Sequence, residues 1–379
     1  LGWGVGMQLV FAAFIFLFPA GTTLFLAANN AIVKVLDAAS AGSRFLFGRL
    51  AVPPGATDGE PSLGFILAFQ AFPTIVFFSA LMAILYYYGI MQRIIRVFAR
   101  LFSKLMRVSG AESLVAASNI FTGVESALAV RPFLAAMTRS ELCTILTVGM
   151  ATVSSNVMAL YVFTLKPEFP TIAGHLMSAS ILSAPAALVL SKILVPETGV
   201  PETLGITVTP DVERESSLFE AIINAANAGI RVIVGISGLL LAVLGLVALA
   251  DMLFGALGGY VNAHLGTSLP CSFREILGLV FYPFTMALGI PPDDTALVAR
   301  IIGERVVLTE VVSYQDLAAA LAAGKLIHPR SAVIAAYALC GFAHLASMAI
   351  FVGGVAALVP DRTRDLSGVA VRALLAATL

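Results

Sequence analysis

Long apolar runs dominate the pattern of hydrophobic and polar positions along this chain. The runs are continuous and do not alternate with a period of two, so they predict membrane-spanning helices rather than a β-barrel. We expect spanning segments at residues 1–19, 64–90, 142–165, 169–191, 232–250 and 331–359. The longest polar stretch, residues 195–217, predicts an exposed loop between two halves. Residues 22–62 mix charged and apolar positions, and we interpret them as a loop with a surface-lying helix.

In one segment, basic residues recur with the period of an α-helix. Residues 91–107, "MQRIIRVFARLFSKLMR", place a basic residue at every third or fourth position and fill the rest with apolar ones. This pattern predicts an amphipathic helix on a membrane surface. The positive-inside rule places that helix on the cytoplasmic side.

A polar-tipped segment follows. Residues 113–135 begin and end near basic residues and carry Asn119 and Gly123 at their middle, which favours a re-entrant hairpin that enters from the cytoplasm. Two capping-box patterns mark helix starts on either side, Ser109-x-x-Glu112 and Thr138-x-x-Glu141.

The second half repeats this order of elements. Each half has an amphipathic helix, a polar-tipped segment with one deep glutamate, and a long apolar helix interrupted by small polar residues. The interruptions are "ATVSSN" (151–156) and "CGFAHLAS" (340–347). By counting spans, the second hairpin enters from outside, so the pattern predicts the inverted repeat of secondary transporters.

Composition narrows the class. Hydrophobic residues make up 59% of the 379 positions and charged residues 12%, with a mean hydropathy of +0.97, which is typical of a multi-pass membrane protein. The formal net charge of zero gives no reason to expect a nucleic-acid partner. The cysteines are scattered, and neither metal-ligand spacing nor a phosphate-binding loop is present, so we predict no enzyme. The chain opens inside an apolar segment without Met and closes in a short apolar stretch, so we expect both ends to be cut.

Two intramembrane acids are the main functional candidates. Glu125 and Glu310 take equivalent positions in the two halves. Each could be a structural acid that fixes a helix tip. However, intramembrane carboxylates usually mark an ion or substrate path. They could accept hydrogen bonds from a polyhydroxylated solute or carry a proton.

The interrupted helices supply further candidates. Thr152, Ser154, Ser155 and Asn156 could coordinate Na⁺ together with unwound main-chain carbonyls, or simply pack between helices. His344 could be a packing residue, a substrate donor or a proton carrier.

Several long blocks resemble the concentrative nucleoside transporter family. They are "FPTIVFFSALMAILYYYGIMQ" (72–92), "SGAESLVAASNIF" (109–121), "RPFLAAMTRSEL" (131–142), "SAPAALVLSKILVPET" (183–198) and "YALCGFAHLAS" (337–347). The resemblance implies an all-α polytopic protein with two re-entrant hairpins and two discontinuous helices. It also implies a homotrimer in the cell inner membrane, in contact with lipid, that imports a nucleoside by alternating access, coupled to Na⁺ or, in some members, to H⁺.

The resemblance also assigns substrate residues. Gly123-Val124-Glu125-Ser126 matches the family's base-reading Gly-Gln-Thr/Ser-Glu, with Val124 replacing Gln; Glu125 is expected to keep the acid's role, although an ungapped alignment would put Ser126 there. Glu310 matches the acceptor of ribose hydroxyls. Phe342 and Ser347 match the family's Phe-Ala-Asn-x-x-Ser, in which His344 replaces the Asn, and Val157 matches a substrate-lining Val.

The same comparison implies a sodium site at Asn119, Thr122, Thr152 and Val153. Replacing Gln by Val124 removes a donor and an acceptor and is expected to relax or redirect the base preference. The sequence therefore predicts a cation-coupled nucleoside symporter. The alternatives are the same scaffold carrying a modified nucleoside, a nucleobase or another small polar solute, with H⁺ coupling possible, and a receptor or channel.

These predictions divide the chain into six parts. They are scaffold helices with a surface loop or helix (1–90), an interfacial amphipathic helix (91–107), a first transport repeat (108–194), a cytoplasmic loop (195–217), a scaffold helix (218–254) and a second transport repeat (255–379).

Overall fold

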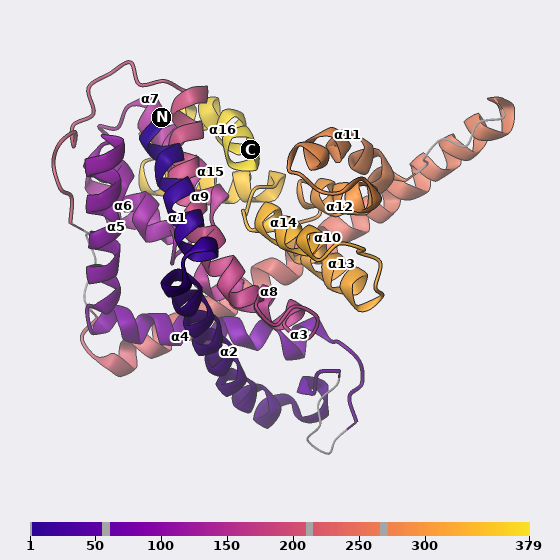
Figure 1. Cartoon of the computed structure of the whole chain (residues 1–379). Helices are drawn as coiled ribbons and strands as arrows, with labels where there is room; N and C mark the ends of the chain where they lie inside the picture. The colour runs from indigo at the N-terminus through magenta and orange to yellow at the C-terminus, as the bar shows by residue number, and fades with distance from the viewer. Residues whose placement is uncertain (1, 55–60, 210–214, 266–271) are drawn as a thin grey trace.

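The computed structural model of the chain describes residues 2–54, 61–209, 215–265 and 272–379. This part is helical and contains no β-strand, which confirms the predicted all-α class (Figure 1). Among the described residues, five helices are long and apolar enough to cross a membrane: Pro19–Ala51, Leu67–Tyr87, Arg139–Leu165, Ile172–Leu194 and Leu218–Tyr260.

The N-terminal region corrects one prediction. Residues 22–62 were expected to form a loop with a surface-lying helix, but α2 runs without a break over Pro19–Phe47 after α1 (Gly2–Leu17). A 3₁₀ turn, η1 (Gly48–Ala51), extends it. The charged positions Lys34, Asp37 and Arg44 lie within this helix, and the Asp37 carboxylate is 2.6 Å from the Lys166 ammonium. The short α3 (Leu67–Gln70) and α4 (Phe72–Tyr87) follow.

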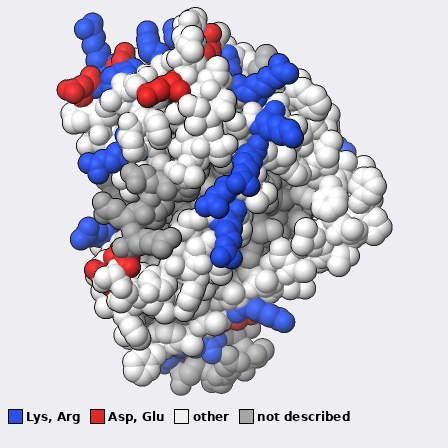
Figure 2. Space-filling view, turned by 90° about the vertical axis from the view of Figure 1, so that its left-hand side faces the viewer, with Lys and Arg blue, Asp and Glu red and all other residues white. Residues whose placement is uncertain are grey.

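The basic segment is the helix α5 (Ile90–Met106), as its periodicity predicts. Its apolar face is buried through Met91, Ile95, Ala99 and Phe102. The basic side chains Arg93, Arg100, Lys104 and Arg107 are exposed on the opposite side. Figure 2 shows a row of basic side chains across the face of the molecule on which α5 lies.

The first repeat contains a hairpin and an interrupted helix. The hairpin consists of α6 (Gly110–Asn119) and the 3₁₀ segment η2 (Val124–Phe133). The interrupted helix consists of α7 (Arg139–Ala151) and α8 (Ser155–Leu165), and α9 (Ile172–Leu194) closes the repeat. Both predicted capping boxes are confirmed, at the starts of α6 and α7.

The described part of the linker between the halves has no regular helix, as predicted. It is tied to the first repeat, because the buried Thr203 accepts hydrogen bonds from the main-chain N–H groups of Gly110 and Ala111 at the start of α6. The following helix, α10 (Leu218–Leu265), continues past the predicted boundary at residue 254. It packs along α4 and projects from the rest of the molecule (Figure 1).

The second repeat has the same order of elements. It consists of α11 (Phe273–Ala287), the hairpin of α12 (Pro292–Arg305) and α13 (Glu310–Ala322), and the interrupted helix of α14 (Pro329–Leu339) and α15 (Leu345–Leu358). A 3₁₀ turn, η3 (Pro360–Arg362), leads into the last helix, α16 (Thr363–Thr378).

One main-chain contact occurs in both repeats. The N–H of Ser155, at the start of α8, donates to the carbonyl of Phe121 at the first hairpin turn, 3.1 Å away. The N–H of Leu345, at the start of α15, donates to the carbonyl of Val306 at the second hairpin turn, 3.2 Å away. Helix starts leave N–H groups without intrahelical partners, and here each hairpin turn satisfies one of them.

The two helix interruptions also meet each other. A side chain at Gly341 would place its Cβ 3.3 Å from the carbonyl oxygen of Ala151 and 3.4 Å from that of Met150. Glycine allows this close approach because it has no Cβ. The approach brings the residues that follow Gly341 next to the end of α7.

Candidate functional site

The first cluster lies where α6 ends against the interruption between α7 and α8. Asn119 is fully buried, and its Nδ2 donates to the Val148 carbonyl at 2.8 Å and to the Gly149 carbonyl at 3.3 Å. These are two of the last four carbonyls of α7, which have no helical partner because the helix stops at Ala151. The Asn119 amide also donates to the Thr152 hydroxyl.

Other oxygens gather around this contact. The Thr152 hydroxyl lies 3.0 Å from the Asn119 carbonyl, and the Ser126 hydroxyl donates to Asn119 Oδ1 at 2.9 Å. The Ser180 hydroxyl lies 3.2 Å from the Ile120 carbonyl and 3.5 Å from that of Val153. The structure therefore brings Asn119, Thr152 and the Val153 carbonyl to one place.

Two further candidate residues, Thr122 and Ser126, lie close to this cluster. Thr122 follows the end of α6, and its hydroxyl donates back to the Ser118 carbonyl at 3.0 Å, which leaves its own carbonyl as its candidate ligand. Ser126 contacts Asn119, so it belongs to this cluster. The side chains of Val124 and Glu125 lie outside the described residues.

The chemistry of this donor set fits a hard cation. Amide, hydroxyl and main-chain carbonyl oxygens are the ligands that such cations prefer. Carbonyls at interrupted helices supply Na⁺ sites in secondary transporters. Asn119 Oδ1, the Thr152 hydroxyl and the carbonyls of Thr122 and Val153 could hold such an ion.

The second cluster surrounds Glu310, the first residue of α13. Its side chain is 1% exposed. Oε1 accepts a hydrogen bond from the Tyr161 hydroxyl at 2.5 Å, and Oε2 lies 3.2 Å from His344 Nε2. His344 is fully buried at the N-cap of α15. Elements from both repeats, α8, α13 and α15, therefore meet at one carboxylate.

The N-cap fixes the tautomer of His344. The main-chain N–H of Ser347 lies 3.1 Å from His344 Nδ1, and a main-chain N–H can only donate, so Nδ1 carries the lone pair. The ring proton of neutral His344 is therefore on Nε2 and faces Glu310. Ser347 completes a capping box, because its hydroxyl accepts from the His344 N–H at 3.0 Å.

The contact between Glu310 and His344 is close but poorly directed. Among the described residues, neither Glu310 Oε2 nor His344 Nε2 has a partner with acceptable hydrogen-bond geometry. Buried polar atoms are normally hydrogen-bonded. These two atoms therefore retain capacity for a group that both donates and accepts.

Two apolar candidates border this cluster. The rings of Phe342 and His344 lie 4.7 Å apart in an edge-on arrangement. Val157 is half-buried on α8, one turn before Tyr161, and so lies on the same side of that helix.

Sequence reasoning missed Tyr161 and gave Arg305 no role. Tyr161 reads as one more apolar position in α8, and only the fold brings it to Glu310. Arg305 is 3% exposed, and its guanidinium donates to the Ala338 carbonyl at 2.5 Å. Sequence reasoning also gave no role to Thr309, which directly precedes Glu310. Its backbone has φ 122° and ψ 157°, a conformation that is essentially restricted to glycine.

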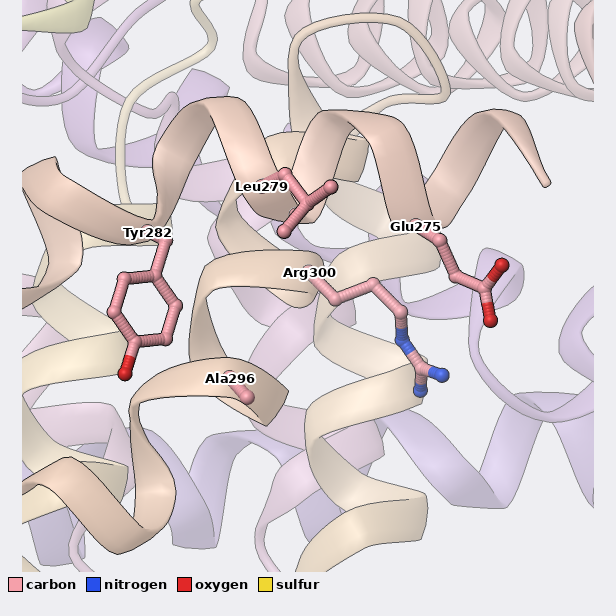
Figure 3. Close-up of a pocket in the computed structure, with 6 residues that line it drawn as sticks. Glu275, Leu279, Tyr282, Ala296 and Arg300 are labelled. Atoms are coloured by element: carbon pink, nitrogen blue, oxygen red, sulfur yellow. The ribbon is translucent and has the colours of Figure 1, made fainter. Parts of the chain in front are cut away.

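A separate pocket lies on the outer part of the second repeat. It is lined from α11 and α12 by Glu275, Gly278, Leu279, Tyr282, Ala296 and Arg300 (Figure 3). None of its lining residues belongs to the two clusters. The buried oxygens and the helix interruptions therefore define the candidate site better than this cavity does.

The fold and the clusters define a helical membrane transporter with two hairpins and two interrupted helices. The family model of "Na+ dependent nucleoside transporter C-terminus" matches residues 175–379, "Nucleoside recognition" matches 68–168, and "Na+ dependent nucleoside transporter N-terminus" matches 1–50. The chain belongs to this family of concentrative nucleoside transporters.

Relatives and solved structures agree. An "Uncharacterized transporter" of Haemophilus influenzae is 34% identical over 390 residues, covering 99% of this chain and 87% of that protein. "Solute carrier family 28 member 3" of Mus musculus is 34% identical over 392 residues, covering 100% of this chain and 53% of that protein. The chain thus spans about half the length of this mammalian relative. The structure of CNTnw in an inward-facing substrate-bound state is similar, with a TM-score of 0.87, 33% identity, and 100% and 87% coverage of the two chains.

Proposed function

We propose that this chain imports nucleosides across the cell inner membrane by alternating access, coupled to Na⁺. Family membership supports the transport of a nucleoside. The oxygen cluster at Asn119 and Thr152 supports a cation as the coupling ion. The similar CNTnw structures include an inward-facing and an outward-facing state, which supports alternating access. The homotrimer remains part of the proposal.

The observation that carries the proposal is the pair of incompletely bonded atoms on Glu310 and His344. A ribose hydroxyl both donates and accepts, so it can donate to Glu310 Oε2 and accept from His344 Nε2–H. His344 thereby takes the donor role that the family gives to Asn. Phe342 and Val157 supply apolar surface beside the sugar, and Ser347 holds His344 in place. Val124 and Glu125 on η2 are assigned to the base. The Ser126 hydroxyl donates to Asn119 Oδ1 in the cation cluster, and its oxygen can still accept a hydrogen bond from the base.

The cation and the substrate would be coupled through the helix interruptions. Na⁺, when bound, supplies positive charge that holds the end of α6 against the start of α8. The Phe121 carbonyl and the Ser155 N–H already join these two elements, and Tyr161 lies further along α8 at Glu310. Ordering of α8 by the ion would therefore favour the arrangement that accepts a nucleoside.

The test is uptake into proteoliposomes with a panel of nucleosides, with and without an inward Na⁺ gradient and separately with a proton gradient. We expect saturable uptake that requires Na⁺. Absence of saturable uptake for every nucleoside under both gradients contradicts the proposal. Flux that neither saturates nor responds to a gradient indicates a channel.

A second candidate keeps the scaffold and changes the solute to a nucleobase, a modified nucleoside or another small polar compound, with H⁺ as the possible coupling ion. Val124 favours it, because the family reads the base with Gln at that position. Thermal-shift measurements with nucleosides and nucleobases distinguish the two. Strong stabilisation by uridine or adenosine contradicts the second candidate.

A further inference from the structure

Tyr161 occupies a defined place in the Glu310 cluster. Its side chain is 1% exposed, and its ring stacks on that of Tyr314 with centroids 4.5 Å apart and an interplanar angle of 29°. Tyr314 is itself buried and donates to the Ala336 carbonyl at 2.9 Å. The stacked pair leaves the Tyr161 ring little freedom, so its hydroxyl reaches Glu310 from one direction.

The hydrogen bond from Tyr161 gives the two carboxylate oxygens of Glu310 different surroundings. Oε1 is engaged at 2.5 Å by the phenol, whereas Oε2 faces His344 without a well-directed bond. A carboxylate turns about its last single bond unless one oxygen is held, since that torsion is broad. A bond from a neutral donor to an ionised acceptor is also stronger than a neutral pair.

We propose that Tyr161 is a positioning residue that clamps Glu310 Oε1, so that Oε2 is presented at a fixed angle to the sugar hydroxyls of the substrate. This inference rests on the proposed function. The inference means that α8 contributes to the discrimination between ribose and deoxyribose, together with the second hairpin and α15. A fixed acceptor reduces the entropy lost when a ligand with a matching hydroxyl binds. A deoxy ligand, which lacks that hydroxyl, does not gain this advantage in affinity.

The test compares Tyr161→Phe with Tyr314→Phe. Each variant removes one buried hydroxyl from the same stacked pair, but only the first removes the donor to Glu310. Uptake of a ribonucleoside and of its 2′- and 3′-deoxy analogues with the same base is measured in proteoliposomes. For Tyr161→Phe we expect KM for the ribonucleoside to rise by about tenfold, equivalent to one hydrogen bond. The preference over the deoxy analogues should fall, with the half-saturating Na⁺ concentration unchanged.

Unchanged KM and sugar preference in Tyr161→Phe, or the same changes in Tyr314→Phe, would overturn the inference. A thermal-unfolding cycle with Glu310→Gln gives a readout that needs no substrate. If Tyr161 clamps Glu310, Tyr161→Phe should destabilise the Glu310→Gln variant less than it destabilises the wild type. Equal destabilisation of both, that is, additive effects, would contradict the clamp. If Tyr161→Phe does not fold, the double variant decides: recovery of folding supports the clamp, and failure of both contradicts it.

The two proposals can fail separately. If the unfolding cycle shows non-additive effects but the wild-type protein transports no nucleoside, the proposed function is wrong and the contact between Tyr161 and Glu310 still stands. Nucleoside uptake by the wild type, with an additive cycle and unchanged sugar preference, would remove only the role of Tyr161.

Discussion

Asn119 and Thr152 join the end of one hairpin helix to the interruption of another helix. The Asn119 amide donates to the Thr152 hydroxyl, which in turn lies 3.0 Å from the Asn119 carbonyl. Both residues are buried. The contact closes the end of α7 and gathers oxygens at the place where Na⁺ is proposed to bind.

Removal of the Thr152 hydroxyl tests this assignment. We expect Thr152→Ala to raise the Na⁺ concentration needed for half-maximal uptake by about tenfold, because one oxygen ligand is lost. Thr152→Ser keeps the hydroxyl and should remain near the wild type. The measurement is uptake against Na⁺ concentration at fixed nucleoside. An identical Na⁺ dependence in the Ala variant would point to protons or to a site made only of main-chain carbonyls.

Neutralisation of Glu310 should impair uptake more than folding. Glu310→Gln keeps the shape but replaces one acceptor oxygen by a donor, so we expect a loss in uptake efficiency of about ten- to hundredfold, the range for hydrogen bonds to charged groups. Uptake kinetics and thermal unfolding are measured together. Normal uptake by this variant would exclude Glu310 from the site.

Glu304→Gln is the matched control on the same hairpin. Glu304 is fully buried, with its carboxylate oxygens 3.4 Å from Arg300 Nε and 3.6 Å from Arg274 Nη1. Its loss should lower stability with little change in KM. Because Arg274 is 35% and Arg300 is 45% exposed, the loss of stability should be smaller than the value of about 3–5 kcal/mol that is typical of fully buried pairs. A large rise in KM without loss of stability would contradict this division of roles.

His344 should tolerate asparagine better than leucine. Asn is among the best N-cap residues, so His344→Asn should keep the cap of α15 and still offer an N–H group to Glu310. His344→Leu should lose about 1 kcal/mol of stability from the cap and most of the uptake. Thermal unfolding and uptake are compared for the two variants. Equal losses in both would show that the imidazole itself is required.

Thr309→Gly should stabilise the protein and impair transport. Relief of a backbone conformation that costs about 1–3 kcal/mol outweighs the entropic cost of glycine, about 0.5–1 kcal/mol, so the melting temperature should rise. Greater freedom before Glu310 should raise KM. Ser313→Gly, later in the same helix at ordinary helical geometry, should instead lower the melting temperature. A lower melting temperature in Thr309→Gly would mean that the strain is absent.

The sequence by itself determined the class and the order of elements. Continuous apolar runs, the charge period of α5 and the capping boxes at Ser109 and Thr138 are local signals, because each depends on residues within a few positions of one another. Glu310 stood out for the same reason, as a carboxylate that is costly to bury in an apolar chain. The resemblance to the family then added roles that local patterns do not carry.

Only the tertiary structure decided which side chains meet. Asp37 pairs with Lys166 and Tyr161 with Glu310 across separations of 129 and 149 positions, and no local period encodes such contacts. For the same reason, residues 22–62 were expected to form a loop with a surface-lying helix instead of the long helix α2, and Tyr161 was not singled out. The tautomer of His344 follows from an N-cap that exists only because α14 stops before it. The hydrophobic pattern sets where helices form, but the partners that make a buried polar group tolerable are set by packing.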